Sequence, residues 1–349
     1  MRNKEKGEIR KVQLTGGSTY TISLPKKWMD KMELGAGEGM LIEEQGSSLL
    51  LSPAKLEREE RRESKMEVDP QESVDSINRK ILSLYLVGYN VINITSSGDR
   101  LNSSQREAIK DFVRKKLVGT EIISESIEEI SLRTLLSYSE LSVKGALRRM
   151  YRVATSMQEN AMTALEENDR ELAKDVVEID DEVDRFQMYL IREIKAAIQN
   201  PSLLDEIGLK TSRECLGYRL VSTSVERVGD HAATMAKNFL EMENPIDEDS
   251  LQKLKEINSL SNSILKKSVE SLFDENYEEA EVVIQKLGKI YSLEEEMNQF
   301  LVEENPPEAM RIRLILESMR RIAEYGSDVA EIVLNLTVTK QNSSLPEEE

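Results

Sequence analysis

The sequence predicts a multidomain, mainly α-helical protein: a small β-rich N-terminal domain, a small α+β middle domain and C-terminal tandem three-helix bundles. Three observations support this prediction. From about residue 141 to residue 339, apolar residues recur at helical spacing. Residues 8–52 alternate in short runs separated by glycines, a pattern typical of strands and tight turns. Residues 66–135 mix helical and strand-like runs.

Length and composition agree with several domains and exclude some classes of protein. The chain has 349 residues, of which 39% are hydrophobic and 32% are charged, so it is too apolar for a disordered chain. Its single cysteine, Cys215, excludes a disulfide framework and a cysteine-based zinc module within one chain. The start shows no signal peptide, and the most apolar segment, residues 81–94, is too short to span a bilayer. We therefore expect a cytoplasmic protein without membrane insertion.

The N-terminal domain is predicted at residues 1–55. A short helix is expected at residues 26–32, directly after Pro25, which a helix start tolerates. Short strands are expected at residues 10–14, 20–24, 40–43 and 48–52. A unit this small buries little apolar surface by itself, so we expect it to dimerise.

Charge is distributed unevenly along the chain. The formal net charge is −18, yet residues 1–31 hold eight basic and three acidic residues and carry +5. This asymmetry favours a polyanion-binding end on an acidic body, and the alternative is a solvated terminus with a few lysines. If the partner is DNA, the candidate contacts are Arg10, Lys11, Lys26 and Lys27.

The middle of the chain begins with a charged run at residues 56–65, interpreted as a linker or a solvated helix. Residues 66–140 are predicted to form the α+β domain. Helices are expected at residues 73–87 and 103–117, and strands at 90–95 and near 121–124 and 130–132. The segment contains no glycine-rich phosphate loop and no cluster of potential ligands, so its residues assign it no function.

Two helical repeats are predicted at residues 141–245 and 246–340, followed by an acidic tail at 341–349. About six long helices are expected, with breaks near Asn168, Pro201, Pro245, Asn276 and Pro306–Pro307. The second helices align as residues 179–186 with 293–300, and the third as 225–236 with 319–330. The apolar stripe of the first repeat's third helix is expected to comprise Leu216, Leu220, Val221, Val225, Val228, Ala232, Met235, Ala236 and Phe239.

Two acidic pairs in the first repeat are candidate metal ligands. Glu226 and Asp230 lie one turn apart on the third helix, and Asp180 and Asp184 lie one turn apart on the second. Like charges at this spacing repel each other, and four carboxylates from adjacent helices would form a site of hard oxygen ligands. The alternative is a solvated acidic face, which is common in a chain this acidic.

Catalysis has little support in the sequence. His231 is the single histidine, and it is either a metal ligand or, as is more usual, a hydrogen-bonded structural residue. One histidine and one distant cysteine do not provide Ser-His or Cys-His nucleophilic machinery. We expect no enzyme activity, and the remaining catalytic alternative is a metal-dependent hydrolase or oxidase built on a helical bundle.

Residues 225–236, Val-Glu-Arg-Val-Gly-Asp-His-Ala-Ala-Thr-Met-Ala, resemble the signature helix of the PhoU family of phosphate-uptake regulators, and the tandem three-helix repeats resemble its architecture. The resemblance implies that the family's acidic motif falls on Glu226/Asp230, with a companion at Asp180/Asp184. It implies metal binding there, with iron, manganese, zinc or magnesium as the candidate ions. It also implies partners in phosphate uptake, namely a phosphate ABC transporter ATPase or a signalling kinase.

The second repeat departs from this pattern. At the four corresponding positions it has Glu294, Asn298, Arg320 and Glu324. Their formal charges sum to −1, against −4 in the first repeat. Because Arg320 and Glu324 attract each other at this spacing without any metal ion, we expect the second repeat to bind metal weakly or not at all.

The N-terminal domain resembles a different family. Residues 10–28, followed by Leu34-Gly-Ala-Gly-Glu-Gly, resemble the AbrB/MazE (SpoVT-AbrB) swapped-hairpin DNA-binding domain. That resemblance implies two intertwined chains that present basic residues to DNA. The pairing of such a head with a PhoU-like body resembles archaeal phosphate regulators.

The predicted function is therefore a homodimeric, DNA-binding transcriptional regulator of phosphate uptake. The helical body would sense a metal, phosphate status or a partner protein. The alternative is a PhoU-type adaptor that restrains a phosphate transporter or signalling kinase by protein contact and uses its head only to dimerise.

Overall fold

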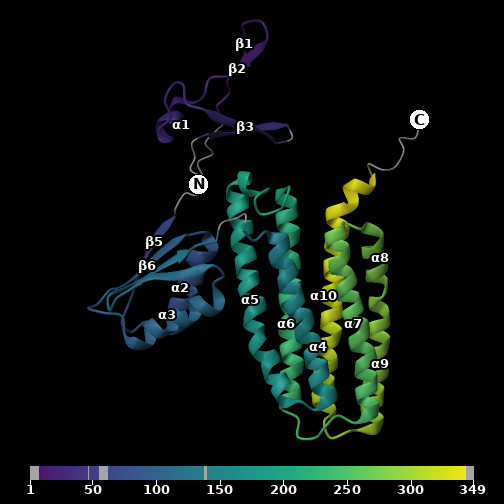
Figure 1. The fold of residues 1–349 in the computed structure, drawn as a ribbon. Helices are drawn as coiled ribbons and strands as arrows, with labels where there is room; N and C mark the ends of the chain where they lie inside the picture. The colour runs from purple at the N-terminus through teal and green to yellow at the C-terminus, as the bar shows by residue number, and fades with distance from the viewer. Residues whose placement is uncertain (1–7, 46, 55–61, 137–139, 343–349) are drawn as a thin grey trace, which may run out of the picture. The chain divides into compact units, whose positions relative to one another are not determined.

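The computed structural model describes residues 8–45, 47–54, 62–136 and 140–342 (Figure 1). The chain forms two compact units, residues 1–61 and residues 62–349. Most of the predicted linker and the end of the predicted acidic tail, residues 56–61 and 343–349, lie outside the described residues. Over the described ranges, no helix has both the length and the apolar composition needed to cross a membrane.

The N-terminal unit contains two antiparallel hairpins and one short helix. Its elements are β1 (Gln13–Thr15), β2 (Thr19–Thr21), α1 (Lys26–Lys31), β3 (Met40–Gln45) and β4 (Ser48–Pro53). β1 pairs with β2, and β3 pairs with β4. Gly16 and Gly17 turn the first hairpin with φ angles of +64° and +80°, which glycine adopts without the steric cost of a Cβ. The predicted small β-rich domain is confirmed.

The middle domain is a four-stranded sheet with two helices. Its elements are β5 (Glu63–Val68), α2 (Val74–Val87), β6 (Val91–Ser96), α3 (Ser103–Lys116), β7 (Thr120–Glu125) and β8 (Glu129–Thr134). The strand order is β5-β6-β8-β7, in which β5 and β6 are parallel and the other pairs are antiparallel. The predicted α+β character is confirmed, but residues 63–65, which we assigned to the charged linker, begin strand β5. Only two side chains of β5 are buried, Met66 and Val68. The charged residues beside them make the segment look like part of the linker.

Both helices pack against the sheet and share one core with it. Tyr85 of α2 and Ile109 of α3 are fully buried together with Ile94 of β6 and Leu132 of β8. Asn102 begins α3 with a capping box, because its side chain accepts from the backbone N–H of Gln105 and the Gln105 side chain accepts from the backbone N–H of Asn102. This cap sets the direction of α3, whose last residue is Lys116.

The C-terminal part is entirely helical and supports the predicted bundles. The first repeat comprises α4 (Val143–Glu167), α5 (Arg170–Gln199), the short 3-10 helix η1 (Pro201–Leu203) and α6 (Ser212–Leu240). The second comprises α7 (Glu248–Asp274), α8 (Tyr277–Gln285), α9 (Leu287–Glu304) and α10 (Ala309–Asn342). The side chains of Ser142, Asp169, Thr211, Asp247 and Asn276 accept backbone hydrogen bonds at helix starts.

The second repeat has one helix more than we predicted. A tight turn at Lys286, whose N–H bonds to the carbonyl of Val283 over 3.0 Å, divides its second helix into α8 and α9. The two repeats share one continuous hydrophobic core, and α10 runs alongside both α6 and α7 (Figure 1). A Cβ added to Gly326 of α10 would lie 3.0 Å from the α7 backbone at Leu265, so a side chain here would push α7 and α10 apart.

The predicted apolar stripe of α6 needs one correction. Leu216 and Leu220 are 62% and 50% exposed, whereas the members from Val221 onward are buried. The reason is angular, because Leu220 precedes Val221 by one residue and therefore points about 100° away from the buried face.

Candidate functional site

The acidic residues of the first repeat are held by two helices that approach each other closely. Asp180 and Asp184 lie on α5, and Glu226 and Asp230 lie on α6. Between the α6 acids stands Gly229, where an added Cβ would lie 3.3 Å from Val183 and 3.5 Å from Asp180. The missing side chain lets the two helices approach and brings their acidic faces together.

Three of the four predicted ligands converge. Asp184, Glu226 and Asp230 each offer a carboxylate oxygen, and these three oxygens lie within 4.8 Å of one another. No other group of three potential ligands this close occurs among the described residues. Asp180 stands outside this trio, but its Oδ1 is buried and has no hydrogen-bond partner.

The electrostatics of the cluster favour the binding of protons or of a cation to its carboxylates. Burial, reinforced by Asp230 and Asp184, raises the pKa of Asp180 to about 6. Burial and the neighbouring Asp230 and Asp184 likewise raise the pKa of Glu226 to about 7, although a hydrogen bond with Gln187 opposes the shift. Burial, followed by Asp184, also raises the pKa of Asp230. Asp184 and Glu226 are half-buried and Asp230 is exposed; carboxylates this close repel one another, and a cation relieves that repulsion.

The residues present fit a hard or borderline metal ion. Every donor is a carboxylate oxygen, which suits magnesium, manganese and iron, and zinc also accepts such ligands. The buried Oδ1 of Asp180 is an acceptor without a donor, and such a group costs free energy unless a proton or cation satisfies it. Asp180, Asp184, Glu226 and Asp230 would hold the ion.

A lysine from the middle domain reaches this cluster. Lys116, the last residue of α3, places its Nζ 2.7 Å from Asp184 Oδ2 and 2.6 Å from Asp181 Oδ1. Burial opposes its charge, but the hydrogen bonds to Asp181 and Asp184 outweigh that cost and raise the pKa of Lys116. Lys116 is therefore a charged neighbour of one predicted ligand.

Sequence reasoning missed Lys116, Asp181 and Gln187. Lys116 ends a run of three basic residues, Arg114 to Lys116, and no local pattern shows which of them faces α5. Asp181 lies beside the predicted pair on α5 and is more exposed than Asp184. Gln187 is buried on the same helix, where helical spacing from Asp184 could have suggested a neighbouring polar group.

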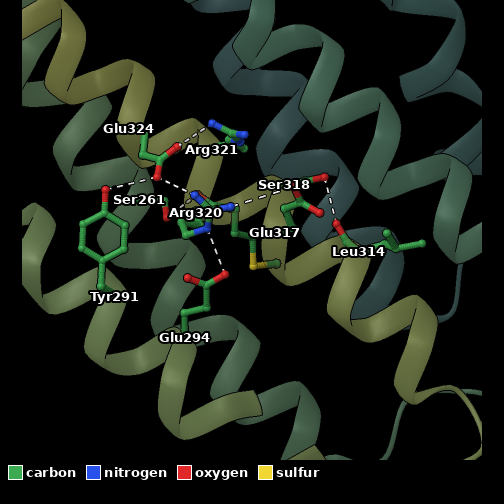
Figure 2. A network of polar contacts seen from close by, with 10 residues as sticks. Ser261, Tyr291, Glu294, Leu314, Glu317, Ser318, Arg320, Arg321 and Glu324 are labelled. Carbon is green, nitrogen blue, oxygen red and sulfur yellow. Dashed lines mark hydrogen bonds and ion pairs between the residues drawn. The ribbon is translucent and has the colours of Figure 1, made fainter.

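In the second repeat, an arginine occupies the centre of the corresponding region. Figure 2 shows Arg320 pointing between Glu294 and Glu324, with Tyr291 also directed at Glu324. Arg320 Nε lies 2.9 Å from Glu294 Oε1, and its Nη1 lies 2.5 Å from Glu324 Oε1. The Tyr291 hydroxyl donates to the same Glu324 oxygen over 3.1 Å. Arg320 thus provides both carboxylates with a shared, hydrogen-bonded counter-charge.

His231 lies apart from the acidic trio. Its ring centroid is 5.7 Å from that of Tyr325 on α10. Burial, together with Arg321, lowers the pKa of His231, and its Nδ1 has no hydrogen-bond partner. His231 and Tyr325 occupy the same position in the two aligned third helices, so this contact joins equivalent points of the two repeats.

The candidate DNA contacts all lie on the surface of the N-terminal unit. Arg10 and Lys11 lie just before β1, separated from it by Val12, and Lys26 and Lys27 lie in the first turn of α1. All four are exposed, and Arg10 also pairs with Glu8 over 2.5 Å. Exposed cations are compatible with phosphate contacts.

The N-terminal unit also exposes its apolar residues. Every side chain whose burial is described in residues 8–54 is exposed or half-buried. The large apolar side chains left in solvent are Ile9, Val12, Leu14, Tyr20, Ile22, Met32, Leu41, Ile42 and Leu49. Apolar surface exposed to this extent is typical of interaction sites.

Family models match both parts of the chain. The model described as the PhoU domain matches residues 147–239 and 254–333. The model described as antidote-toxin recognition MazE, bacterial antitoxin, matches residues 13–59. These matches confirm the two resemblances drawn from residues 225–236 and 10–28.

Individual relatives match just over half of this chain. A phosphate-specific transport system accessory protein PhoU homolog from Clostridium acetobutylicum is 22% identical over 203 residues, which cover 56% of this chain and 90% of that one. A homolog of the same description from Xylella fastidiosa is 23% identical over 195 residues, which cover 54% and 79%. The crystal structure of PhoU from Pseudomonas aeruginosa aligns with a TM-score of 0.52 at 20% identity, covering 56% and 96%. This structural likeness concerns the fold alone.

Proposed function

We propose that this chain, a PhoU-domain protein with a MazE-type N-terminal domain, is a cytoplasmic regulator of phosphate uptake that acts by binding DNA. The phosphate role rests on its relatives, described as accessory proteins of phosphate-specific transport systems. The DNA role rests on the MazE-type match at residues 13–59 and the net charge of +5 on residues 1–31.

The observation that carries the proposal is the surface of the N-terminal unit. Both of its hairpins expose apolar side chains, such as Leu14 and Tyr20 on the first and Ile42 and Leu49 on the second. A second copy of the chain would cover them and form a homodimer, as swapped-hairpin domains do. The dimer would then carry two sets of the basic residues, which suits the two strands of a DNA duplex.

The helical body supplies the sensing part of the proposal. A metal ion at Asp180, Asp184, Glu226 and Asp230 would bind hard oxygen ligands and bring counter-charge to a self-repelling cluster. Iron, manganese, zinc and magnesium are the candidate ions. Metal occupancy would then change the forces between α5 and α6, which pack against each other at Gly229.

A second candidate function follows from the same relatives. The chain could act as an adaptor that restrains a phosphate ABC transporter or its signalling kinase through protein contact, with a head that only dimerises. The relatives are described as accessory proteins of a phosphate-specific transport system, which favours this alternative. DNA binding separates the two proposals.

The experiment compares three full-length proteins on duplexes from the protein's own promoter and from phosphate-transport promoters. The first is the wild type, and the second replaces Arg10, Lys11, Lys26 and Lys27 by Ala. The third removes four exposed lysines of the body and serves as a charge-matched control: Lys80, Lys174, Lys266 and Lys289. Fluorescence anisotropy at increasing salt measures affinity.

We expect the head variant to lose binding to all duplexes, because phosphate contacts position the protein without reading bases. A dimer using all four cations on each chain would show a slope of log K against log salt of about −7. The control should bind like the wild type. Equal binding by all three proteins, or no binding by the wild type, would favour the adaptor.

A further inference from the structure

The middle domain contacts α5 at two places. The first contact is polar and buried. Arg192 of α5 donates hydrogen bonds to the carbonyls of Tyr85 and Tyr89, over 2.5 Å and 2.9 Å, at the end of α2. Its guanidinium also stacks over the Tyr85 ring, 4.8 Å from the centroid. Met188, on the same helix, packs against the core of the middle domain. Arg192 is 2% exposed, so water does not replace these bonds easily.

The second point is the ion pair between Lys116, at the end of α3, and Asp181 and Asp184. Asp184 and Arg192 are eight residues apart, which corresponds to about 12 Å along α5. The Lys116 side chain keeps 27% of its exposure, so this contact is wetter than the one at Arg192. The two attachments therefore lie at separate places on α5 and differ in strength.

Asp184 belongs to two arrangements. It pairs with Lys116 over 2.7 Å, and it is one of the three acids whose oxygens lie within 4.8 Å of one another. A divalent ion held by that trio would stand only a few ångströms from an ammonium group. Two positive charges at such a distance repel strongly in a partly exposed site as well, so both occupants compete for Asp184.

We propose that Lys116 is a built-in competitor of the metal ion, and that metal binding in the first repeat releases the α3 end of the middle domain while Arg192 retains the α2 end. The inference rests on the metal site of the proposed function. A Lys116 displaced from Asp184 is left only with Asp181, whose side chain is 51% exposed, and so exposed an ion pair contributes too little to hold the α3 end in place. Metal occupancy is thereby converted into a tilt of the middle domain.

Linkage makes this coupling reciprocal: if the metal weakens the ion pair, the ion pair weakens metal binding by the same factor. The test titrates Mn²⁺ into the full chain by calorimetry, using the wild type, Lys116→Met and Lys115→Met. Lys115 is the neighbouring exposed lysine on α3, so the second variant removes an equal charge without touching Asp184. Lys116→Arg retains a cation at the critical position.

We expect Lys116→Met to bind Mn²⁺ about fivefold or more tightly than the wild type, in the usual range of coupling between sites. Lys115→Met should stay close to the wild type, because salt screens a charge that makes no direct contact with Asp184. Lys116→Arg should also stay close to it, because the arginine keeps a cation at that position. Hydrogen exchange supplies the second readout. Mn²⁺ should accelerate exchange in residues 103–116 of the wild type and leave residues 74–87, next to Arg192, unchanged.

The outcomes separate this inference from the function on which it rests. Equal Mn²⁺ affinity in the wild type and Lys116→Met would overturn the competition while the metal site stands. Unchanged exchange in residues 103–116 on Mn²⁺ addition would overturn the release. Absence of Mn²⁺ binding in all four proteins would overturn the proposed metal site and this inference with it.

Discussion

Arg320 donates a hydrogen bond to Glu294 over 2.9 Å, and the two residues stand where the first repeat has Glu226 and Asp180. The first repeat thus places two acids at positions where the second places an ion pair. Glu294 and Glu324 of the second repeat pair with an arginine of their own repeat, whereas Asp184 of the first repeat pairs with Lys116 of the middle domain.

The first prediction concerns metal content. Replacing Asp184 and Asp230 by Asn should strip the metal from the first repeat, because it halves the formal charge of the four-residue cluster. Glu324→Gln is the matched change in the second repeat and should alter metal content little. Elemental analysis after metal is added back under non-chelating conditions measures both. Full metal occupancy in the Asp184/Asp230 variant, or no metal in the wild type, would show that these acids form a solvated face and not a metal site.

The second prediction concerns the pH dependence of metal binding. Mn²⁺ affinity should increase as pH rises from 5 to 7.5, because Asp180 and Glu226, with pKa values raised by burial to about 6 and about 7, must lose their protons before they ligate. Below both values each released proton contributes about tenfold per pH unit. Calorimetry in buffers of different ionisation enthalpy counts the protons released. An affinity independent of pH would contradict the assignment.

The third prediction concerns Arg320. Arg320→Ala leaves Glu294 and Glu324 without their central cation, so the free energy of unfolding should fall by about 2 kcal/mol, between the effects of surface and buried ion pairs. Arg321→Ala is the control, because that more exposed arginine bonds only the outer oxygen of Glu324, and it should cost less than about 1 kcal/mol. Urea unfolding measures both, and equal losses would show that Arg320 has no special role.

The fourth prediction concerns Glu193, which is 3% exposed and has an Oε2 without a hydrogen-bond partner. Burial raises its pKa to about 8, although Arg192 opposes the shift. The folded protein therefore binds a proton that the unfolded chain releases at an ordinary pKa of 4.5. Since the folded state binds more protons, the free energy of unfolding falls as pH rises from 4.5 to 8 and then levels off.

Glu193→Gln removes this titration. The variant should gain stability relative to the wild type as pH rises, by about 4 kcal/mol at pH 8. Urea unfolding at pH 5, 7 and 8.5 tests the slope, with Glu171→Gln as the exposed control. A constant difference between variant and wild type across this range would show that Glu193 does not titrate as proposed.

Much of this architecture is visible in the sequence because it depends on local spacing. The helical periodicity after residue 141, the turn at Gly16 and Gly17, and the cap at Asn102 each involve residues within a few positions of one another. The same holds for Glu226/Asp230 and for Arg320/Glu324, because residues one helical turn apart share a face.

Other features depend on which segments meet in space. The charged residues of β5 give no clear strand pattern in the sequence. The strand is defined by its parallel pairing with β6, which lies more than twenty residues later in the chain. The turn at Lys286 contains no proline, so the sequence does not predict it. Leu216 and Leu220 look like core residues by their steps of three and four, yet the face that α6 buries is decided by its neighbours.

For the candidate site, the sequence by itself determined the four acids and the charge difference between the repeats, because covalent order places each pair one turn apart on its helix. Only the tertiary structure decided that Asp184, Glu226 and Asp230 converge and that Lys116, 68 residues from Asp184, joins them. The physical reason is that an ion pair between distant segments depends on the packing of whole helices, here α3 against α5 and α5 against α6, and no local pattern records that packing.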